Sequence, residues 1–321
     1  MNAVRPEGEA DLAISTTALV KRFGRHEAVG GIDLRVPRGS VFGFLGPNGS
    51  GKTTTIRMLL GLAAPTSGEI RVLGAAMPAA GNEVLPRVGA LVEAPAFLPF
   101  LSGIENLRRL DSANRAAPGG TRAVRIASAL ERVGLAHAGA TKVKAYSLGM
   151  KQRLGIAGAL LLPRELLILD EPTNGLDPQG TREVRSLIRS LAHAGTTVFV
   201  SSHLLAEVDQ VCTHAAVMSH GSLVASSSIE ALRSGGESSL RVLTPDATAA
   251  VAALAALGLA GTADEQEGLV AAPLPQDGPP VEHVVAALVS AGVRVRGIER
   301  SGRSLEERFV ALTGEGFDVD G

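Results

Sequence analysis

The strongest constraint on the fold of this 321-residue chain is a glycine-rich octapeptide, Gly46-Pro47-Asn48-Gly49-Ser50-Gly51-Lys52-Thr53. It fits the pattern G-x-x-x-x-G-K-[ST], in which the glycines let backbone N–H groups turn inward around a phosphate. An apolar, strand-like run precedes it at residues 41–45, and a helix-like run follows at residues 54–60. An ordinary glycine turn is the alternative. The strand before the loop and the helix dipole behind it favour an anion site.

The same loop supplies candidate ligands for a nucleotide and a metal. The Lys52 ammonium would reach the β- and γ-phosphates, and the Thr53 hydroxyl would hold Mg²⁺. The sequence therefore predicts nucleotide binding with Mg²⁺. The residues expected to contact the nucleotide here are Gly46, Pro47, Asn48, Gly49, Ser50, Gly51, Lys52, Thr53 and Thr54.

Two carboxylates follow the apolar, strand-like run of residues 166–169. Asp170, at the tip of this run, can hold Mg²⁺ through water beside Thr53. Glu171 comes one residue later and can polarise a water aimed at the γ-phosphate. Buried strands often end in an acidic residue for structural reasons, so these two carboxylates alone do not indicate a catalytic site. Together with the phosphate loop upstream, they do.

Composition excludes several other classes of site. The formal net charge of −1 argues against a polyanion-binding surface, so we expect no nucleic-acid partner. Cys212 is the single cysteine of the chain, which fits a reducing compartment, and we expect it to be a small buried hydrophobe. The seven histidines lack metal-ligand spacing, so no zinc site is expected.

Hydropathy favours a chain that does not enter a membrane. Residues 1–11 carry two Glu and one Asp where a signal peptide would be apolar. The apolar run 154–163 is too short to cross a bilayer. Residues 247–263 are mostly Ala, with Val251, Leu254 and Leu257 at three-residue steps, which predicts one packed face of a helix.

The expected secondary structure changes along the chain. Residues 12–41 alternate in the manner of antiparallel strands, and residues 69–74 read as a further strand. Helical periodicity then prevails from about residue 94 to 163, where Val124, Ala127, Leu130 and Val133 recur at three-residue steps.

Beyond this helical region, buried-type strands are expected at residues 166–169 and 197–200, on either side of a helix around residues 182–194. Gly235-Gly236 predicts a linker. The alternating strands and Ala-rich helices after it predict a small α+β module.

The segment at residues 146–153, Tyr-Ser-Leu-Gly-Met-Lys-Gln-Arg, resembles the signature of the ATP-binding-cassette (ABC) ATPases, usually written L-S-G-G-Q. Ser147 and Gly149 match it, whereas positions 146, 148 and 150 depart from it. The Ser hydroxyl, the Gly backbone and a helix beginning near Ser147 would form a second anion site. Ser147 can also be a plain helix N-cap, and the two roles are compatible.

Other landmarks occur in the order of this family. Asp177 lies in a segment similar to the loop after the catalytic glutamate, where the family's Asp crosses a dimer interface. His203 resembles the switch histidine that contacts the γ-phosphate, although a lone His at a strand end is often structural. Phe23 occupies the position of the aromatic that stacks on adenine, with Val29 nearby, or else belongs to the core. The resemblance implies that Glu171 and His203 are catalytic and that ATP is hydrolysed.

Glu93 is the most informative departure from the family pattern. Most members have Gln at this position, where it contacts Mg²⁺ and the transmembrane partner. A carboxylate can still ligate Mg²⁺, but it loses the amide donor. With its neighbours, Glu93 resembles the bacterial exporters that confer self-protection against bacitracin and lantibiotic peptides. A tolerated surface substitution is the alternative.

The resemblance covers roughly residues 12–235 and implies an α/β fold, the P-loop NTPase ABC cassette. Such a cassette has a RecA-like core, an antiparallel β subdomain and a helical subdomain, here about residues 94–163. We expect the ATPase domain over residues 11–235 and a C-terminal α+β accessory domain over residues 236–321. Residues 304–314 are similar to the tail of many bacterial drug-export ATPase subunits, daunorubicin-type exporters included.

In this family two cassettes face each other head to tail, and we expect a homodimer. ATP on the loop of one cassette would be enclosed by Ser147 and Gly149 of the other. Because no span is expected, the movement would pass to separate transmembrane permease subunits through the region near residues 93–106.

The expected function is therefore the ATP-binding and ATP-hydrolysing subunit of an exporter for a drug, antibiotic or peptide, cytoplasmic and peripheral on the inner face of the membrane. A soluble ABC ATPase of translation or DNA repair is a rival, but the chain lacks tandem cassettes and a long coiled-coil insertion. A non-catalytic nucleotide-gated module is disfavoured by Glu171 and His203.

Overall fold

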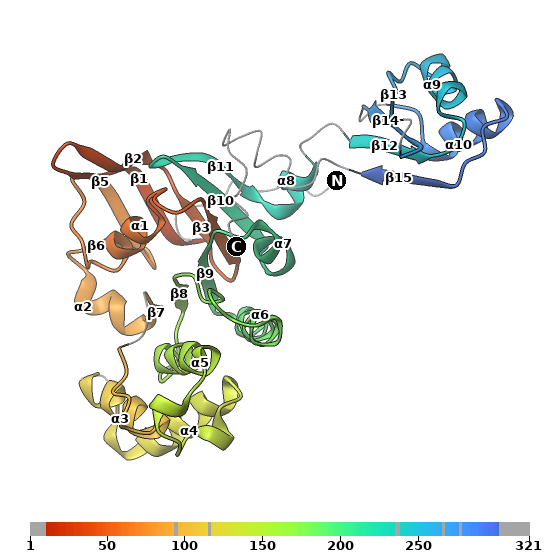
Figure 1. The fold of residues 1–321 in the computed structure, drawn as a ribbon. Helices are drawn as coiled ribbons and strands as arrows, with labels where there is room; N and C mark the ends of the chain where they lie inside the picture. The colour runs from red at the N-terminus through yellow and green to blue at the C-terminus, as the bar shows by residue number, and fades with distance from the viewer. Residues whose placement is uncertain are drawn as a thin grey trace. The chain divides into compact units, whose positions relative to one another are not determined.

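The computed structural model describes residues 11–92, 96–114, 117–234, 238–264, 267–275 and 278–301 (Figure 1). The chain forms two compact units, residues 1–227 and 228–321. The sequence predicts a domain border at 235/236, whereas the compact units divide at 227/228. Helix α8 (Ile229–Ser234) therefore groups with the second unit. Gly235 and Gly236, the expected linker, lie outside the described residues.

An antiparallel sheet begins the first unit. Its strands are β1 (Leu12–Phe23), β2 (His26–Ile32), β3 (Arg35–Pro37), β5 (Ser67–Val72) and β6 (Ala75–Met77). Their order is β2-β1-β5-β6, with β3 also paired to β1. All four pairings are antiparallel, which confirms the strands predicted from the alternating pattern at residues 12–41 and 69–74.

A six-stranded sheet of order β11-β10-β4-β9-β8-β7 positions the site. Its strands are β4 (Val41–Leu45), β7 (Val88–Leu91), β8 (Leu166–Leu169), β9 (Thr197–Ser202), β10 (His214–Ser219) and β11 (Ser222–Ser228). Strands β10, β4, β9, β8 and β7 run parallel to one another. Every residue of β4 and β8 is buried, as is typical of strands covered on both faces. The carboxyl ends of β4, β9 and β8 therefore meet at one edge.

Three phenylalanines fix the strands that carry this edge. Phe42 and Phe44 of β4 and Phe199 of β9 are fully buried. The Phe42 and Phe199 rings stack with centroids 5.8 Å apart, and those of Phe44 and Phe199 are 5.3 Å apart. Such pairs add about 0.5–1.5 kcal/mol to the free energy of burial. Packing thus sets the relative position of the loops that leave β4 and β9.

The helices of the first unit are α1 (Lys52–Leu59), α2 (Gly81–Val84), α3 (Gly103–Ala113), α4 (Arg122–Arg132), α5 (Leu148–Ala159), α6 (Pro178–His193) and α7 (Leu205–Val211). Helices α3, α4 and α5 follow β7 and precede β8 in the chain, and they pack on one another (Figure 1). They confirm the helical region predicted for this part of the sequence. Among the described residues, none of the helices combines the length and apolarity that crossing a membrane requires.

The buried face of α4 does not coincide with the three-residue steps seen in its sequence. Val124 is 71% exposed and Ala127 is exposed, whereas Ile126 and Ala129 are buried. The reason is geometric: an α-helix turns by about 100° per residue, so each three-residue step drifts by about 60° from a fixed face. After three such steps a side chain lies on the opposite side of the helix. Leu130 and Val133, the other two residues of this spacing, are buried.

The second unit is a βαββαβ module. Its elements after α8 are β12 (Ser238–Leu243), α9 (Ala247–Ala256), β13 (Thr262–Asp264), β14 (Leu269–Leu274), α10 (Val281–Ser290) and β15 (Gly297–Ser301). The sheet order is β13-β14-β12-β15 and all its pairs are antiparallel, which is the ferredoxin-like arrangement. Leu254 is buried in the core, and Val251 and Leu257 pack against it, as the spacing predicted.

One ion pair in this module, between Arg294 and Asp246, should make the stability of the fold depend on pH. Arg294 donates to the Asp246 carboxylate through its backbone N–H at 3.0 Å, its Nε at 2.9 Å and its Nη2 at 2.6 Å. The hydrogen bonds from Arg294 lower the pKa of Asp246 from 3.8 to about 2. Asp246 precedes α9, so the bonds connect the start of that helix to the segment after α10.

We expect Asp246→Asn to be destabilising at pH 5 but nearly silent at pH 2. Because the folded carboxyl has the lower pKa, its contribution is fully present above the unfolded pKa of about 3.9 and is lost as the pH falls toward 2. The measurement is the melting temperature of the second unit's transition from pH 2 to 6. The control is Glu267→Gln, an exposed carboxylate. A wild-type-minus-variant difference independent of pH would contradict this origin.

Candidate nucleotide-binding and catalytic site

Close backbone approach dictates the glycines of the loop between β4 and α1. Gly51 has φ +101°, and a Cβ added there would lie 2.4 Å from the Ala28 carbonyl oxygen. A Cβ added at Gly46 would lie 2.5 Å from the Met218 carbonyl oxygen. Larger residues do not fit at either position. The loop is thus held against β2 and β10, and α1 begins at Lys52 immediately after it.

Lys52 is a buried cation within this loop, with a side chain 6% exposed. Its Nζ donates to the carbonyl oxygens of Gly46 at 2.6 Å and Pro47 at 3.2 Å, and lies 3.5 Å from Glu171 Oε1. Burial lowers the pKa of the Lys52 ammonium, and Glu171 and Asp170 partly oppose that shift. The ammonium is therefore held at the sheet edge by carbonyls and one carboxylate.

A second buried polar group of the loop fits a polyanionic ligand. The Ser50 hydroxyl is buried and has no hydrogen-bond partner in the structure. Buried hydroxyls are nearly always paired, so an unpaired one beside a buried ammonium suits a ligand rich in acceptor oxygens. This is the composition that a triphosphate requires.

Hard oxygen ligands for a divalent ion come together at the end of β8. Thr53 Oγ1 donates to Asp170 Oδ2 at 3.0 Å, which joins residues far apart in the sequence. In the ranges that the structure describes, no cluster of three or more His, Cys, Asp or Glu side chains could hold a metal by itself. The pair fits Mg²⁺, which keeps several waters and takes substrate phosphates as ligands. When bound, Mg²⁺ would neutralise charge on the phosphates.

Glu171 and His203 are in direct contact. His203 Nδ1 lies 2.7 Å from Glu171 Oε2, and the two side chains are 33% and 21% exposed. Glu171 has φ +47°, a left-handed conformation that is costly for a residue with a side chain. Neighbouring contacts must therefore hold it. A carboxylate with an imidazole next to it, beside a phosphate loop, is equipped to align a water for attack.

Ser201 is a site residue that sequence reasoning missed. It is completely buried at the end of β9, where its hydroxyl donates to Asp170 Oδ1 at 2.6 Å. It also accepts the Glu171 backbone N–H at 2.9 Å. The signal available in the sequence was a pair of serines closing an otherwise apolar strand, Ser201-Ser202 before His203. Ser201 fastens the two acidic residues to the neighbouring strand.

Comparison with known proteins now places the chain. The ABC transporter family model matches residues 29–174. The bacitracin transport ATP-binding protein BcrA of Bacillus licheniformis is 41% identical over 94% of this chain and 98% of its own length. The daunorubicin resistance ATP-binding protein DrrA3 of Streptomyces coeruleorubidus is 38% identical over 95% of this chain and 97% of its own. The chain belongs to the ABC transporter family.

A solved structure agrees with this assignment for the ABC cassette. CbiO1 of Clostridium perfringens, described as part of the transporter complex cbiONQ, matches with a TM-score of 0.63 and 27% identity. The match covers 68% of this chain and 90% of that one. The expected α/β P-loop cassette is confirmed, and the chain is an ATP-binding ATPase subunit of this family.

The signature residues of the cassette lie at helix starts. Ser147 is the N-cap of α5 and accepts the Met150 N–H at 3.2 Å, as the alternative for that residue predicted. Asp177 is the N-cap of α6 and accepts the Gly180 N–H at 2.8 Å. Ser147 and Gly149 thus belong to the start of α5, whereas Lys52 begins α1 and Glu171 follows β8 (Figure 1). Their expected role toward a second cassette remains a prediction.

Phe23 and Val29 differ in environment. Phe23 is 54% exposed at the end of β1, and the Lys21 Nζ lies 4.8 Å from its ring centroid. The alternative that Phe23 belongs to the core is therefore wrong. Val29 is fully buried in the core, beneath the loop that contains Gly51. Glu93 lies outside the described residues, so its expected contact with Mg²⁺ remains a prediction.

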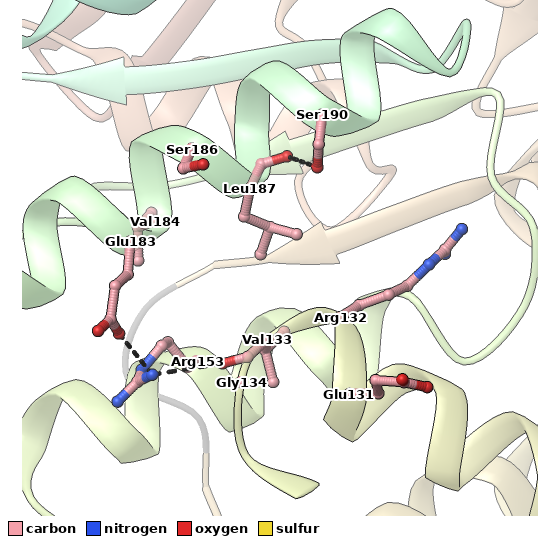
Figure 2. A pocket seen from close by; sticks show the side chains of 10 residues that line it. All are labelled: Glu131, Arg132, Val133, Gly134, Arg153, Glu183, Val184, Ser186, Leu187 and Ser190. Atoms are coloured by element: carbon pink, nitrogen blue, oxygen red, sulfur yellow. Dashed lines mark hydrogen bonds and ion pairs between the residues drawn. The ribbon is translucent and has the colours of Figure 1, made fainter.

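A pocket of about 390 Å³ lies where the helical segment meets α6, and it contains none of the predicted site residues. Figure 2 shows Arg153 of α5 reaching across it to Glu183 of α6, at 2.6 Å. Arg153 also donates to the Val133 carbonyl oxygen at 3.4 Å, and its Nε is buried without a partner. This ion pair joins α5, whose N-cap is Ser147, to α6, whose N-cap is Asp177.

Proposed function

We propose that this chain is the ATP-hydrolysing subunit of an exporter that drives a drug, antibiotic or peptide through separate transmembrane subunits. The observation that carries the proposal is the extent of similarity to the bacitracin transport ATP-binding protein. The identity of 41% covers 94% of the chain, so it reaches well beyond the ATPase core and into the second unit. We accordingly assign the second unit an accessory role in the same assembly.

The proposed site combines residues at the carboxyl ends of β4, β8 and β9 with Phe23 at the end of β1. The loop at residues 46–54 binds the ATP phosphates, and Phe23 stacks on the adenine. Thr53 and Asp170 hold Mg²⁺, with Glu93 as a further ligand. Glu171 aligns the attacking water, and His203 braces the γ-phosphate. The 2.7 Å contact between Glu171 and His203 supports a shared role at the reacting phosphate.

We further propose that two copies of the chain complete each other's sites. Ser147, Gly149 and Asp177 of one copy would enclose ATP bound on the loop of the other. The N-terminus of α5, with the Ser147 hydroxyl at its first turn, is suited to an anion because the first backbone N–H groups of a helix point outward. The ion pair between Arg153 and Glu183 would link that contact to α6.

The surface proposed for the transmembrane subunits lies beside β7. A groove of about 430 Å³ is lined there by residues of β7, α3 and α5, with Phe97 and Leu110 among them. Leu110 is 47% exposed although it belongs to an apolar wall, and Phe97 is partly buried. We propose that an apolar helix segment of a permease covers both, and that the chain then works at the inner face of the membrane.

Co-expression with a candidate permease, a membrane protein with several hydrophobic spans sought among the neighbouring open reading frames, tests the proposal. We expect co-purification of the two chains, and export of a peptide antibiotic that stops when ATP hydrolysis is blocked. Leu110→Glu should abolish co-purification and export while the isolated chain retains its ATP turnover, because it places a charge in the apolar groove. Val124→Glu, at a 71% exposed position of α4, is the matched control. Export without this chain would overturn the proposal.

A further inference from the structure

We propose that Glu207 is a positioning residue that keeps the loops of Glu171 and His203 in register for ATP hydrolysis. The inference rests on the roles proposed above for Glu171 and His203. Glu207 lies in the first turn of α7, four residues after His203, and no residue pattern in the sequence drew attention to it. Its carboxylate contacts three separate segments of the cassette.

The first contact reaches the loop that follows Glu171. The Thr173 hydroxyl donates to Glu207 Oε2, and Thr173 is separated from Glu171 by Pro172 alone. The proline ring fixes the backbone φ between them, so little freedom remains between the clamped threonine and the glutamate. The left-handed backbone of Glu171, with φ +47°, needs such support from its surroundings.

The second contact reaches the loop that contains His203. The Ser202 hydroxyl lies 3.3 Å from the same Glu207 Oε2 and accepts the Leu204 backbone N–H at 3.0 Å. Ser202 and Leu204 are the residues on either side of His203. One carboxylate oxygen therefore fixes the backbone on one side of Glu171 and on both sides of His203.

The third contact supplies the charge that keeps Glu207 in place. Arg185 of α6 lies with its Nη2 3.3 Å from Glu207 Oε1, and the two side chains are 18% and 12% exposed. Arg185 also donates to the Gln210 side-chain oxygen on α7. A mostly buried carboxyl group needs hydrogen-bond partners and an opposite charge to offset its burial. Glu207 has both, and none of these three contacts involves a predicted nucleotide ligand.

Ser201 and Glu207 hold different parts of the segments that carry Glu171 and His203. Ser201 bonds the Asp170 carboxylate and the Glu171 N–H, so it aligns the ends of β8 and β9. Glu207 holds the loops beyond these ends, where the Glu171 and His203 side chains face each other at 2.7 Å. Loss of Glu207 should leave ATP binding intact and reduce only the fraction of complexes with the correct geometry.

The test measures kcat and KM for MgATP in the full chain. We expect Glu207→Ala to lower kcat by about 10- to 100-fold, because a displacement of about 1 Å costs that much, with KM changed less than about twofold. In a His203→Ala background the same substitution should lower kcat by clearly less than it does in the wild type, because the part of the loss that acts through His203 is already gone. Thr173→Val, which removes one hydroxyl, should give a smaller loss with the same dependence on His203.

Gln210→Ala is the matched control, since it removes a partner of Arg185 on the same helix but leaves the bonds to Thr173 and Ser202. Its kcat should stay within about twofold of the wild type. If Glu207→Ala or, should that variant not fold, Thr173→Val retains full kcat, or if its loss multiplies in full with that of His203→Ala, the inference is wrong. If His203→Ala itself is fully active, the proposed role of His203 fails instead.

Discussion

ATP turnover of the Glu171→Gln variant is expected to fall by about 10²- to 10⁴-fold, the range that a lost general base typically costs. The amide keeps the shape of the side chain but cannot accept a proton from water. MgATP binding should persist, because the loop residues, Lys52 and Thr53 are unchanged. If two copies enclose the nucleotide as proposed, ATP is then trapped between them, and the variant should form a stable dimer.

Two measurements check this expectation. Steady-state phosphate release gives the turnover number, and size-exclusion chromatography with saturating MgATP gives the oligomeric state. Glu131→Gln, at an exposed position of α4, is the control for a lost carboxylate elsewhere and should behave as wild type. Undiminished turnover would remove Glu171 from the reaction, whereas a monomer at saturating ATP would count against the paired arrangement alone.

Lys52→Ala is expected to weaken ATP binding by about 10- to 100-fold, since a charge-assisted hydrogen bond contributes about 1.5–3 kcal/mol. The side chain is 6% exposed, so water does not substitute freely for the lost ammonium. The truncation also leaves Glu171 without the cation that lies 3.5 Å away, which adds repulsion toward the incoming phosphates.

Calorimetric titration with MgATP measures this effect directly. Circular dichroism of the same sample shows whether the variant is folded, and Lys144→Ala, at an exposed position before α5, controls for the change of net charge. ATP affinity and turnover equal to those of the wild type would exclude Lys52 from the phosphate site.

The candidate site could be predicted in large part from the sequence because its residues are fixed by local chemistry. The glycine loop needs backbone conformations and close approaches that other residues do not tolerate, as Gly51 shows. Asp170 could be found because a fully apolar strand ends in a charge. These signals depend on a few neighbouring residues, so no knowledge of the tertiary structure is needed to detect them.

What could not be predicted depends on contacts between distant segments. Ser201 and Glu207 become site residues only because β9 lies between β4 and β8, an order that no local pattern specifies. The buried face of α4 could not be predicted from the spacing of Val124 and Leu130 alone, because an α-helix drifts by about 60° at each three-residue step. The βαββαβ order of the second unit likewise arises from pairing of β12 with both β14 and β15, which composition does not reveal.

The Lys52 ammonium and the Glu171 carboxylate, 3.5 Å apart, are counter-ions within the proposed phosphate site. Incoming phosphates would compete with this carboxylate for the same cation. Phosphate binding and release of the proposed base from Lys52 would then be one exchange of counter-ions. For that reason the Glu171→Gln protein, which has no competing carboxylate, should bind ATP at least as tightly as the native chain.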